Sequence, residues 1–182
     1  MSRQKAGLRK EHELARDIYD LTEGRIIPLR SGWSGNQALP SPDLLIPFEN
    51  TLRAVEVKTT NQDKCRIYHE DVEDIQWWVQ KMKEIPTYAY LAIRFSRRCI
   101  YLGQLRRLSN ITKSFETFAE ECPFEAHTTY AGNLTIEKPD TSQWPSAGAS
   151  NDAQYIIDTL HGDTENYEMV SVSEVLGQIN NN

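Results

Sequence analysis

Asp43, Glu56 and Lys58 are the residues of this sequence whose types and spacing best suit chemistry. They lie in two apolar runs that flank Glu49 and Asn50, and this pattern predicts a β-hairpin with a tight turn. In that register Asp43 pairs with Glu56, and Lys58 shares their face because strand side chains alternate. Two adjacent carboxylates repel each other unless a positive charge lies between them. The pattern favours a divalent cation with hard oxygen ligands, beside a lysine.

The same residues also have a simpler interpretation, which is an exposed hairpin face with a cross-strand ion pair. Glu-Val-Lys is a common tripeptide, and a slip of one residue in the pairing would separate the charged groups onto opposite faces. Another carboxylate, Glu11, lies on the apolar stripe of a helix predicted over residues 4–22. A charge on that stripe needs a partner. An ordinary ion pair and a metal or lysine site are both open for Glu11.

A polar loop with two glycines leads into the predicted hairpin, after a short strand expected over residues 25–29. The loop begins at Arg30, whose planar guanidinium suits a phosphate group. An ordinary connection between two strands is the alternative. Arg9 and Lys10 belong to a group of basic residues at the start of the first helix, where they favour phosphate binding or simply a solvated helix end.

The rest of the basic part of the chain predicts an α/β sheet with helices packed against it. A brief strand over residues 66–68 precedes a second helix over residues 70–84. Two further strands are expected over residues 88–95 and 99–102, and a turn or short helix begins at Gly103.

Charge divides the chain into two parts. Residues 1–113 hold 19 Lys and Arg against 14 Asp and Glu, whereas residues 114–182 hold one Lys and 12 Asp and Glu. We expect a basic core over residues 1–113, suited to a polyanion, and an acidic extension over residues 114–182. Within residues 123–165 of the extension, a polar run over residues 141–152 has too few apolar residues to anchor itself and is predicted to be mobile. A short helix is expected over residues 152–160.

Composition also bears on location. No run approaches the ~20 apolar residues of a membrane span, and the polar N-terminus lacks the apolar core of a signal peptide. The three cysteines form no CxxC pair, so they predict neither a zinc site nor a disulfide framework. We therefore expect a cytoplasmic, reducing location and no membrane partner.

The order of five motifs resembles the archaeal Holliday-junction resolvases of the PD-(D/E)xK nuclease superfamily. The Asp…Glu-x-Lys element fits any member of the superfamily, and the helix glutamate and the Arg…Ser-Gly loop make the likeness more specific. The resemblance covers roughly residues 5–108 and implies a restriction-endonuclease-like core, in which helices flank a central mixed β-sheet, with an acidic C-terminal extension. Residues 170–176 resemble a short C-terminal helix of some members. The motifs are Gly7-x-x-x-Glu11-x-Glu13-Leu14, Arg30-x-x-x-Ser34-Gly35, Pro42-Asp43, Glu56-x-Lys58 and Ile67-Tyr68.

This resemblance implies a metal-dependent site. Asp43, Glu56 and Glu11 match the carboxylates that hold the metal, which is expected to be Mg²⁺, with Mn²⁺ as a substitute. Lys58 matches the lysine that positions or activates the attacking water.

The resemblance also implies how the protein meets DNA. Arg30 matches an arginine that contacts a phosphate, and Ser34 matches a loop serine needed for cleavage. With Arg9 and Lys10, Arg30 is expected to form part of the DNA-binding face. Cutting two strands symmetrically implies a homodimer with two active sites, bound to a four-way DNA junction.

The implied function is resolution of four-way junctions by phosphodiester hydrolysis during recombination and repair. One alternative is another nuclease of the superfamily, of repair or restriction type, acting on other DNA, and another is a non-catalytic DNA-binding module. Two departures from the family pattern affect the expected DNA-binding face. His12 stands where many members have arginine, and the start of the second helix is acidic, with Glu70, Asp71, Glu73 and Asp74.

Overall fold

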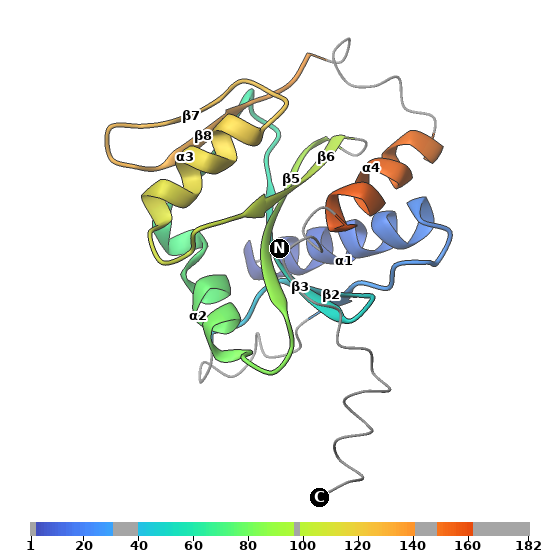
Figure 1. Cartoon of the computed structure of the whole chain (residues 1–182). Coiled ribbons are helices and arrows are strands. Elements are labelled where there is room, and N and C mark those ends of the chain that lie inside the picture. The colour runs from blue at the N-terminus through green and yellow to red at the C-terminus, as the bar shows by residue number, and fades with distance from the viewer. Residues whose placement is uncertain (1–2, 31–39, 97–98, 141–148, 162–182) are drawn as a thin grey trace, which may run out of the picture.

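The computed structural model describes residues 3–30, 40–96, 99–140 and 149–161, and it is built around a central mixed sheet (Figure 1). Five strands form this sheet in the order β1-β2-β3-β5-β6, and β3 and β5 run parallel within it. A second sheet of three strands has the order β4-β8-β7. The elements are α1 (Arg3–Leu21), β1 (Leu29–Arg30), β2 (Leu44–Phe48), β3 (Thr51–Thr59), β4 (Lys64–Ile67), η1 (His69–Asp71), α2 (Glu73–Lys81), β5 (Thr87–Ser96), β6 (Cys99–Leu105), α3 (Ile111–Glu121), β7 (Ala126–Thr128), β8 (Leu134–Glu137) and α4 (Ala149–His161).

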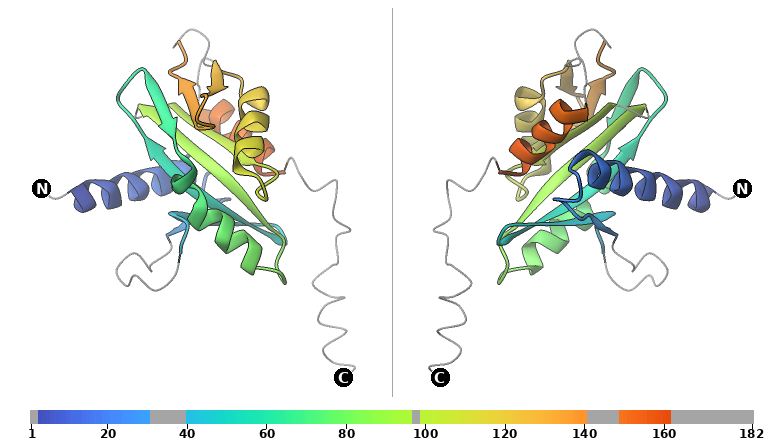
Figure 2. Two further views of the ribbon diagram at one scale, coloured as in Figure 1. Left: turned by 90° about the vertical axis from the view of Figure 1, so that its left-hand side faces the viewer. Right: turned by 90° about the vertical axis from the view of Figure 1, so that its right-hand side faces the viewer.

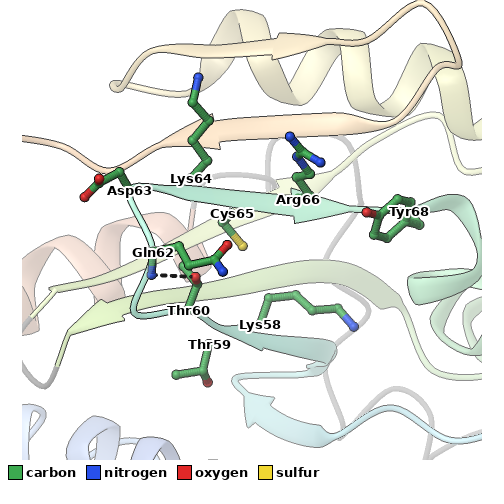
Figure 3. A pocket seen from close by; sticks show the side chains of 9 residues that line it. All are labelled: Lys58, Thr59, Thr60, Gln62, Asp63, Lys64, Cys65, Arg66 and Tyr68. Carbon is green, nitrogen blue, oxygen red and sulfur yellow. Dashed lines mark hydrogen bonds between the residues drawn. The ribbon is translucent and has the colours of Figure 1, made fainter.

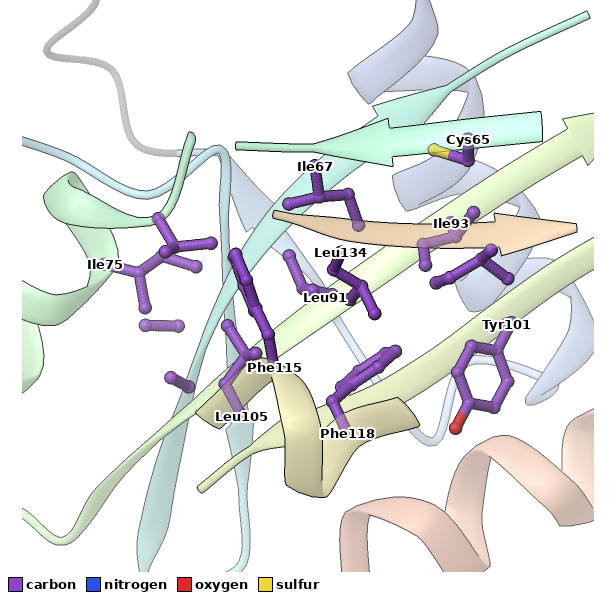
Figure 4. Packing of buried hydrophobic residues seen from close by; sticks show 14 of the residues in the cluster. Cys65, Ile67, Ile75, Leu91, Ile93, Tyr101, Leu105, Phe115, Phe118 and Leu134 are labelled. Carbon is purple, nitrogen blue, oxygen red and sulfur yellow. The ribbon is translucent and has the colours of Figure 1, made fainter. Parts of the chain in front are cut away.

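Both faces of the central sheet are covered, which confirms the predicted fold class (Figure 2). On one face α1 and α4 bury apolar residues such as Ile18 and Leu160 against β2, β3 and β5. On the other face α2, α3 and the second sheet surround a larger apolar cluster (Figure 4), in which Phe115 and Phe118 pack with Leu91. None of the described helices is long and apolar enough to cross a membrane.

The hairpin of β2 and β3 has the register that the sequence predicts. Leu44 pairs with Val55 and Phe48 pairs with Thr51, so the turn falls on Glu49 and Asn50. Glu49 takes a positive φ of 52°, as the turns of two-residue hairpins require. This register, continued by one residue, sets Asp43 opposite Glu56.

Several predicted boundaries differ from the structure. The strand expected over residues 25–29 is reduced to β1, because Ile26 enters the apolar cluster under α1. The second helix is divided into η1 and α2 and ends at Lys81. The turn expected from Gly103 is wrong, because β6 continues to Leu105. A Cβ on Gly103 would lie 2.5 Å from the Phe118 ring, so only glycine lets α3 pack this closely on β6.

The described residues of the acidic C-terminal part, 114–140 and 149–161, form elements that pack on the rest of the fold. The expected boundary at residue 113 falls inside α3, and β8 pairs with β4 through partners such as Leu134 and Ile67. The helix predicted over residues 152–160 is confirmed as α4. Of the run over residues 141–152 that is predicted to be mobile, residues 141–148 lie outside the described residues, and α4 begins at Ala149. The helix expected over residues 170–176 lies outside the described residues.

A buried arginine ties α4 to the central sheet. Arg53 of β3 is fully buried, donates hydrogen bonds to the carbonyl of Leu160 and the hydroxyl of Thr51, and lies 4.5 Å from the centroid of the Tyr88 ring. Because Leu160 lies in the last turn of α4, Arg53 satisfies a helix carbonyl that has no partner within the helix.

Candidate active site

Two carboxylates, Asp43 and Glu56, lie close together, one just before β2 and the other in the middle of β3. Asp43 precedes β2, and its Oδ2 accepts the backbone N–H of Val57 at 2.9 Å. Burial and the neighbouring charge of Asp43 raise the pKa of Glu56 to about 8. Burial likewise raises the pKa of Asp43, although the Val57 N–H opposes that shift. The pair therefore carries more negative charge than its surroundings stabilise when both groups are ionised.

Lys58 lies between this pair and a third carboxylate. Its Nζ is 3.1 Å from Glu56 Oε1 and 2.8 Å from Asp71 Oδ1. The other oxygen of Asp71 accepts the backbone N–H of Tyr68 at 2.7 Å, which fixes the carboxylate at the start of η1. Burial opposes the charge on Lys58, but Glu56 and Asp71 together raise the pKa of the lysine. Lys58 is thus held as a cation whose position is set from both sides.

Glu11 stands beside the pair but has a partner of its own. Its Oε2 accepts hydrogen bonds from Arg30, at 3.0 Å from Nη2 and 3.3 Å from Nε. Arg30 Nη1 also lies 2.7 Å from His12 Nε2. Glu11 is nevertheless near enough for its charge to raise the pKa of Asp43. Of the two interpretations open for Glu11, the structure shows an ion pair, and its partner is an arginine.

The structure brings most of the predicted site residues together. Asp43, Glu56 and Lys58 share one patch, and Glu11 and Arg30 lie at its edge. Within the described ranges, no three side chains of His, Cys, Asp or Glu lie close enough together to hold a metal. Ser34 lies outside the described residues.

The predicted DNA-contacting residues of the first helix are placed less fully. Lys10 is exposed on α1, whereas for Arg9 only the helical backbone is described. The helical spacing of the sequence also predicts that Glu13 and Asp17 face away from the apolar stripe of this helix, but both pair with a buried arginine of the sheet. Arg94 of β5, which is almost fully buried, lies 3.0 Å from Asp17 and 3.7 Å from Glu13.

Asp71 is the site residue that the sequence does not reveal. It belongs to the acidic start of the second predicted helix, which suggests a solvated surface. Residues 70, 73 and 74 are indeed exposed, whereas Asp71 turns toward Lys58. The sequence signal for Asp71 is weak. A carboxylate three residues after Tyr68 fits a capping role, but its contact with Lys58 depends on the tertiary fold, which brings the chain after β4 back to β3.

The donors of this patch suit a hard divalent cation. Two largely buried carboxylates face each other, and the burial that raises the pKa of each is relieved by a bound positive charge. Carboxylate oxygens are the ligands that such ions prefer in proteins. The residues present therefore fit a metal at the Asp43–Glu56 pair.

The raised pKa of Glu56 predicts how the metal-free protein responds to pH. The folded state keeps this proton up to pH about 8, whereas the unfolded chain releases it near 4.5. The folded state binds more protons in this window, so the free energy of unfolding should fall as pH rises from about 4.5 to about 8. Thermal unfolding in chelator measures the slope, and Glu56→Gln should flatten it. An equal slope in Glu56→Gln would mean that another group causes the pH dependence.

Comparison with known proteins identifies the family. Residues 2–130 match the model of the archaeal Holliday junction resolvase (Hjc) family. The solved structure of Hjc from Archaeoglobus fulgidus, a Holliday junction resolvase, is similar with a TM-score of 0.50 and 17% sequence identity, over 81% of this chain and 98% of that one. At this identity the structural likeness shows the fold. None of the curated proteins compared with the chain matches it. Because the family model covers more than half of the sequence, the chain belongs to the archaeal Holliday junction resolvases, a family of metal-dependent nucleases that cut four-way DNA junctions.

Proposed function

We propose that this protein resolves four-way DNA junctions by Mg²⁺-dependent hydrolysis at the patch of Asp43, Glu56 and Lys58. The observation that carries the proposal is the pair of buried carboxylates with raised pKa values, with a lysine 3.1 Å from one of them. The family supplies the reaction, and the geometry supports these residues as its site. Mn²⁺ should substitute for Mg²⁺, since both ions accept carboxylate ligands.

Asp43 and Glu56 would hold the ion, and when bound it supplies a Lewis acid that favours deprotonation of a water and neutralises charge on the phosphate. Glu11 is proposed as a third ligand of the ion. To bind it, the Glu11 carboxylate would have to break its ion pair with Arg30. Arg30 is then available to a DNA phosphate, for which its planar donors are suited.

Lys58 has a separate task in this proposal. Its side chain is 23% exposed, and Glu56 and Asp71 fix the position of its Nζ. An ammonium in that place can orient the attacking water by a hydrogen bond and stabilise charge that develops on the phosphate. Ser34 is proposed as a further group required for cleavage.

Two strands must be cut symmetrically to resolve a junction, and a two-fold symmetric pair of sites meets this need. We therefore propose a homodimer, in which each chain cuts one strand. We also propose that it acts on DNA in the cytoplasm.

Asp71→Asn tests whether the Asp71 carboxylate positions Lys58. Asparagine keeps an oxygen for the Tyr68 N–H but loses the negative charge facing Lys58, so we expect the single-turnover cleavage rate to fall roughly tenfold, as for a lost hydrogen bond to a charged group. Junction affinity should stay unchanged, and Asp71→Asn should add little to the loss in Lys58→Ala. Additive losses in the double variant would show that Asp71 acts independently of Lys58.

A substrate panel tests the function as a whole. The protein is incubated with a four-way junction and with linear duplexes of the same sequences, each in Mg²⁺ and in chelator. We expect paired, symmetric nicks in the junction only, and only with Mg²⁺. Equal cutting of linear duplex would favour a nuclease of repair or restriction type instead.

A further inference from the structure

An open groove leads away from Lys58 along the second sheet (Figure 3). Its first part has a volume of about 620 Å³ and runs from Lys58, at the end of β3, past Lys64 and Arg66 of β4 to Tyr68. A second hollow of about 220 Å³ shares Lys64, Arg66 and Tyr68 and continues over β7 and β8 to His127. The two hollows therefore form one path that starts at the proposed active site.

Side chains of β4 point alternately to its two faces, and this alternation determines which residues line the path. Cys65 and Ile67 point into the apolar cluster, whereas Lys64 and Arg66 project from the opposite face of the strand (Figure 3). Across the sheet Arg66 pairs with Thr135 of β8, and Thr135 pairs with His127 of β7. The outer face of the second sheet is thus polar, with the exposed imidazole of His127 beside the cations, whereas Thr135 is almost fully buried.

Arg66 is the cation best placed to bind a ligand on this face. Lys64 is already paired with Glu137, which offsets its charge. Arg66 is exposed, and among the described residues it has no ion pair or hydrogen bond through its side chain. Beside it Tyr68 exposes 40% of its surface, and an exposed aromatic ring suits stacking against a flat group.

We propose that this groove binds the sugar–phosphate backbone of the DNA strand that leaves the active site, with Arg66 contacting a phosphate and Tyr68 stacking on the nucleotide beside it. The inference rests on the proposed function, because it takes Lys58 to mark the point of cutting. Cations and an exposed aromatic side chain along one path are groups that bind a single DNA strand. The path is continuous with the active site, and this favours DNA over an acidic protein segment.

Arg66→Gln tests the contact, with Lys83→Gln as the matched control. Lys83 is an exposed cation just before β5, and β5 begins at the end of the sheet opposite the groove because β3 and β5 run parallel. Affinity for a labelled four-way junction is measured by fluorescence anisotropy over a series of salt concentrations. We expect Arg66→Gln to weaken binding roughly fivefold at low salt and to reduce the slope of log Kd against log salt by about 0.9, the value for one phosphate contact. Arg66→Lys should restore the slope, and Tyr68→Ala should weaken binding without changing it.

Replacing single phosphates by neutral methylphosphonates, one linkage at a time along an arm, locates the contact. One replacement should weaken binding by the wild-type protein and have no further effect in Arg66→Gln. If Arg66→Gln and Lys83→Gln give the same affinity and slope, the groove does not bind DNA, and the proposal is wrong even though the wild-type protein cuts junctions. If the wild-type protein neither binds nor cuts junctions, it is the proposed function that fails.

Discussion

Asp43→Asn and Glu56→Gln are each expected to reduce single-turnover cleavage of a four-way junction in Mg²⁺ by ~10³-fold or more, as for loss of a main source of transition-state stabilisation. Each substitution keeps the shape of the side chain and removes one negative charge from the pair that would hold the ion. Junction binding should remain, because the substituted groups are acidic and oppose the approach of DNA. The cleavage rate and anisotropy of the same junction measure the two effects separately.

Asp74→Asn is the matched control for these two variants. Asp74 is an exposed carboxylate at the start of α2, so the change in charge is the same, away from the proposed site. Its cleavage rate should equal that of the wild-type protein. Full activity in Asp43→Asn or Glu56→Gln would reject the assignment of the metal site. Loss of binding together with cutting would point to a structural role for the carboxylate.

Lys58→Ala is expected to lower the cleavage rate by ~10² or more, the usual contribution of a group that assists proton transfer or charge stabilisation. The substitution removes the cation at 3.1 Å from Glu56 and 2.8 Å from Asp71. It leaves the oxygen ligands of the proposed metal site in place, so binding of Mn²⁺ should persist while cleavage is lost.

Lys83→Ala serves as the control for Lys58→Ala, because it deletes an exposed lysine at the far end of β5. Thermal unfolding of both variants shows whether the fold is intact. A wild-type cleavage rate in stable Lys58→Ala protein would mean that Lys58 has no part in cleavage. The hairpin face would then carry only an ion-pair cluster, which is the simpler interpretation given above for these residues.

The sequence could predict the centre of this site because local rules determine it. The turn at Glu49 and Asn50 fixes the register of β2 and β3, and the alternation of strand side chains then places Glu56 and Lys58 on one face. The helix α1 was also predictable, since its apolar residues recur at helical spacing and Gly24, with φ of 75°, ends it.

The groups that surround the site could not be predicted in the same way, because they come from distant parts of the chain. Asp71 reaches Lys58 only after β4 and η1 have returned the chain to β3. Arg94 of β5 pairs with Asp17 of α1, two residues far apart in sequence. The periodicity of a single helix cannot reveal such partners, so Asp17 and Asp71 both resembled ordinary surface carboxylates.

Charge was a poor guide to the C-terminal third. A net excess of acidic residues predicted a separate extension, but net charge does not reflect how the apolar residues are distributed. Phe115, Phe118 and Leu134 are buried in the main cluster, and Ile156 and Leu160 are buried under the opposite face. A few well-spaced apolar residues are enough to anchor a short element to an existing core.

Binding of Mn²⁺, followed by electron paramagnetic resonance, tests the central claim most directly, because it reports the metal site without depending on cleavage. The protein is titrated with Mn²⁺, and the signal of the free ion gives the bound fraction for the wild type, Asp43→Asn, Glu56→Gln and the Asp74→Asn control. We predict that the wild type and Asp74→Asn bind the ion at one site per chain and that both pair variants lose this site. Binding of Mn²⁺ to Asp43→Asn and Glu56→Gln with wild-type affinity and stoichiometry would contradict the assignment of the site to this pair of carboxylates.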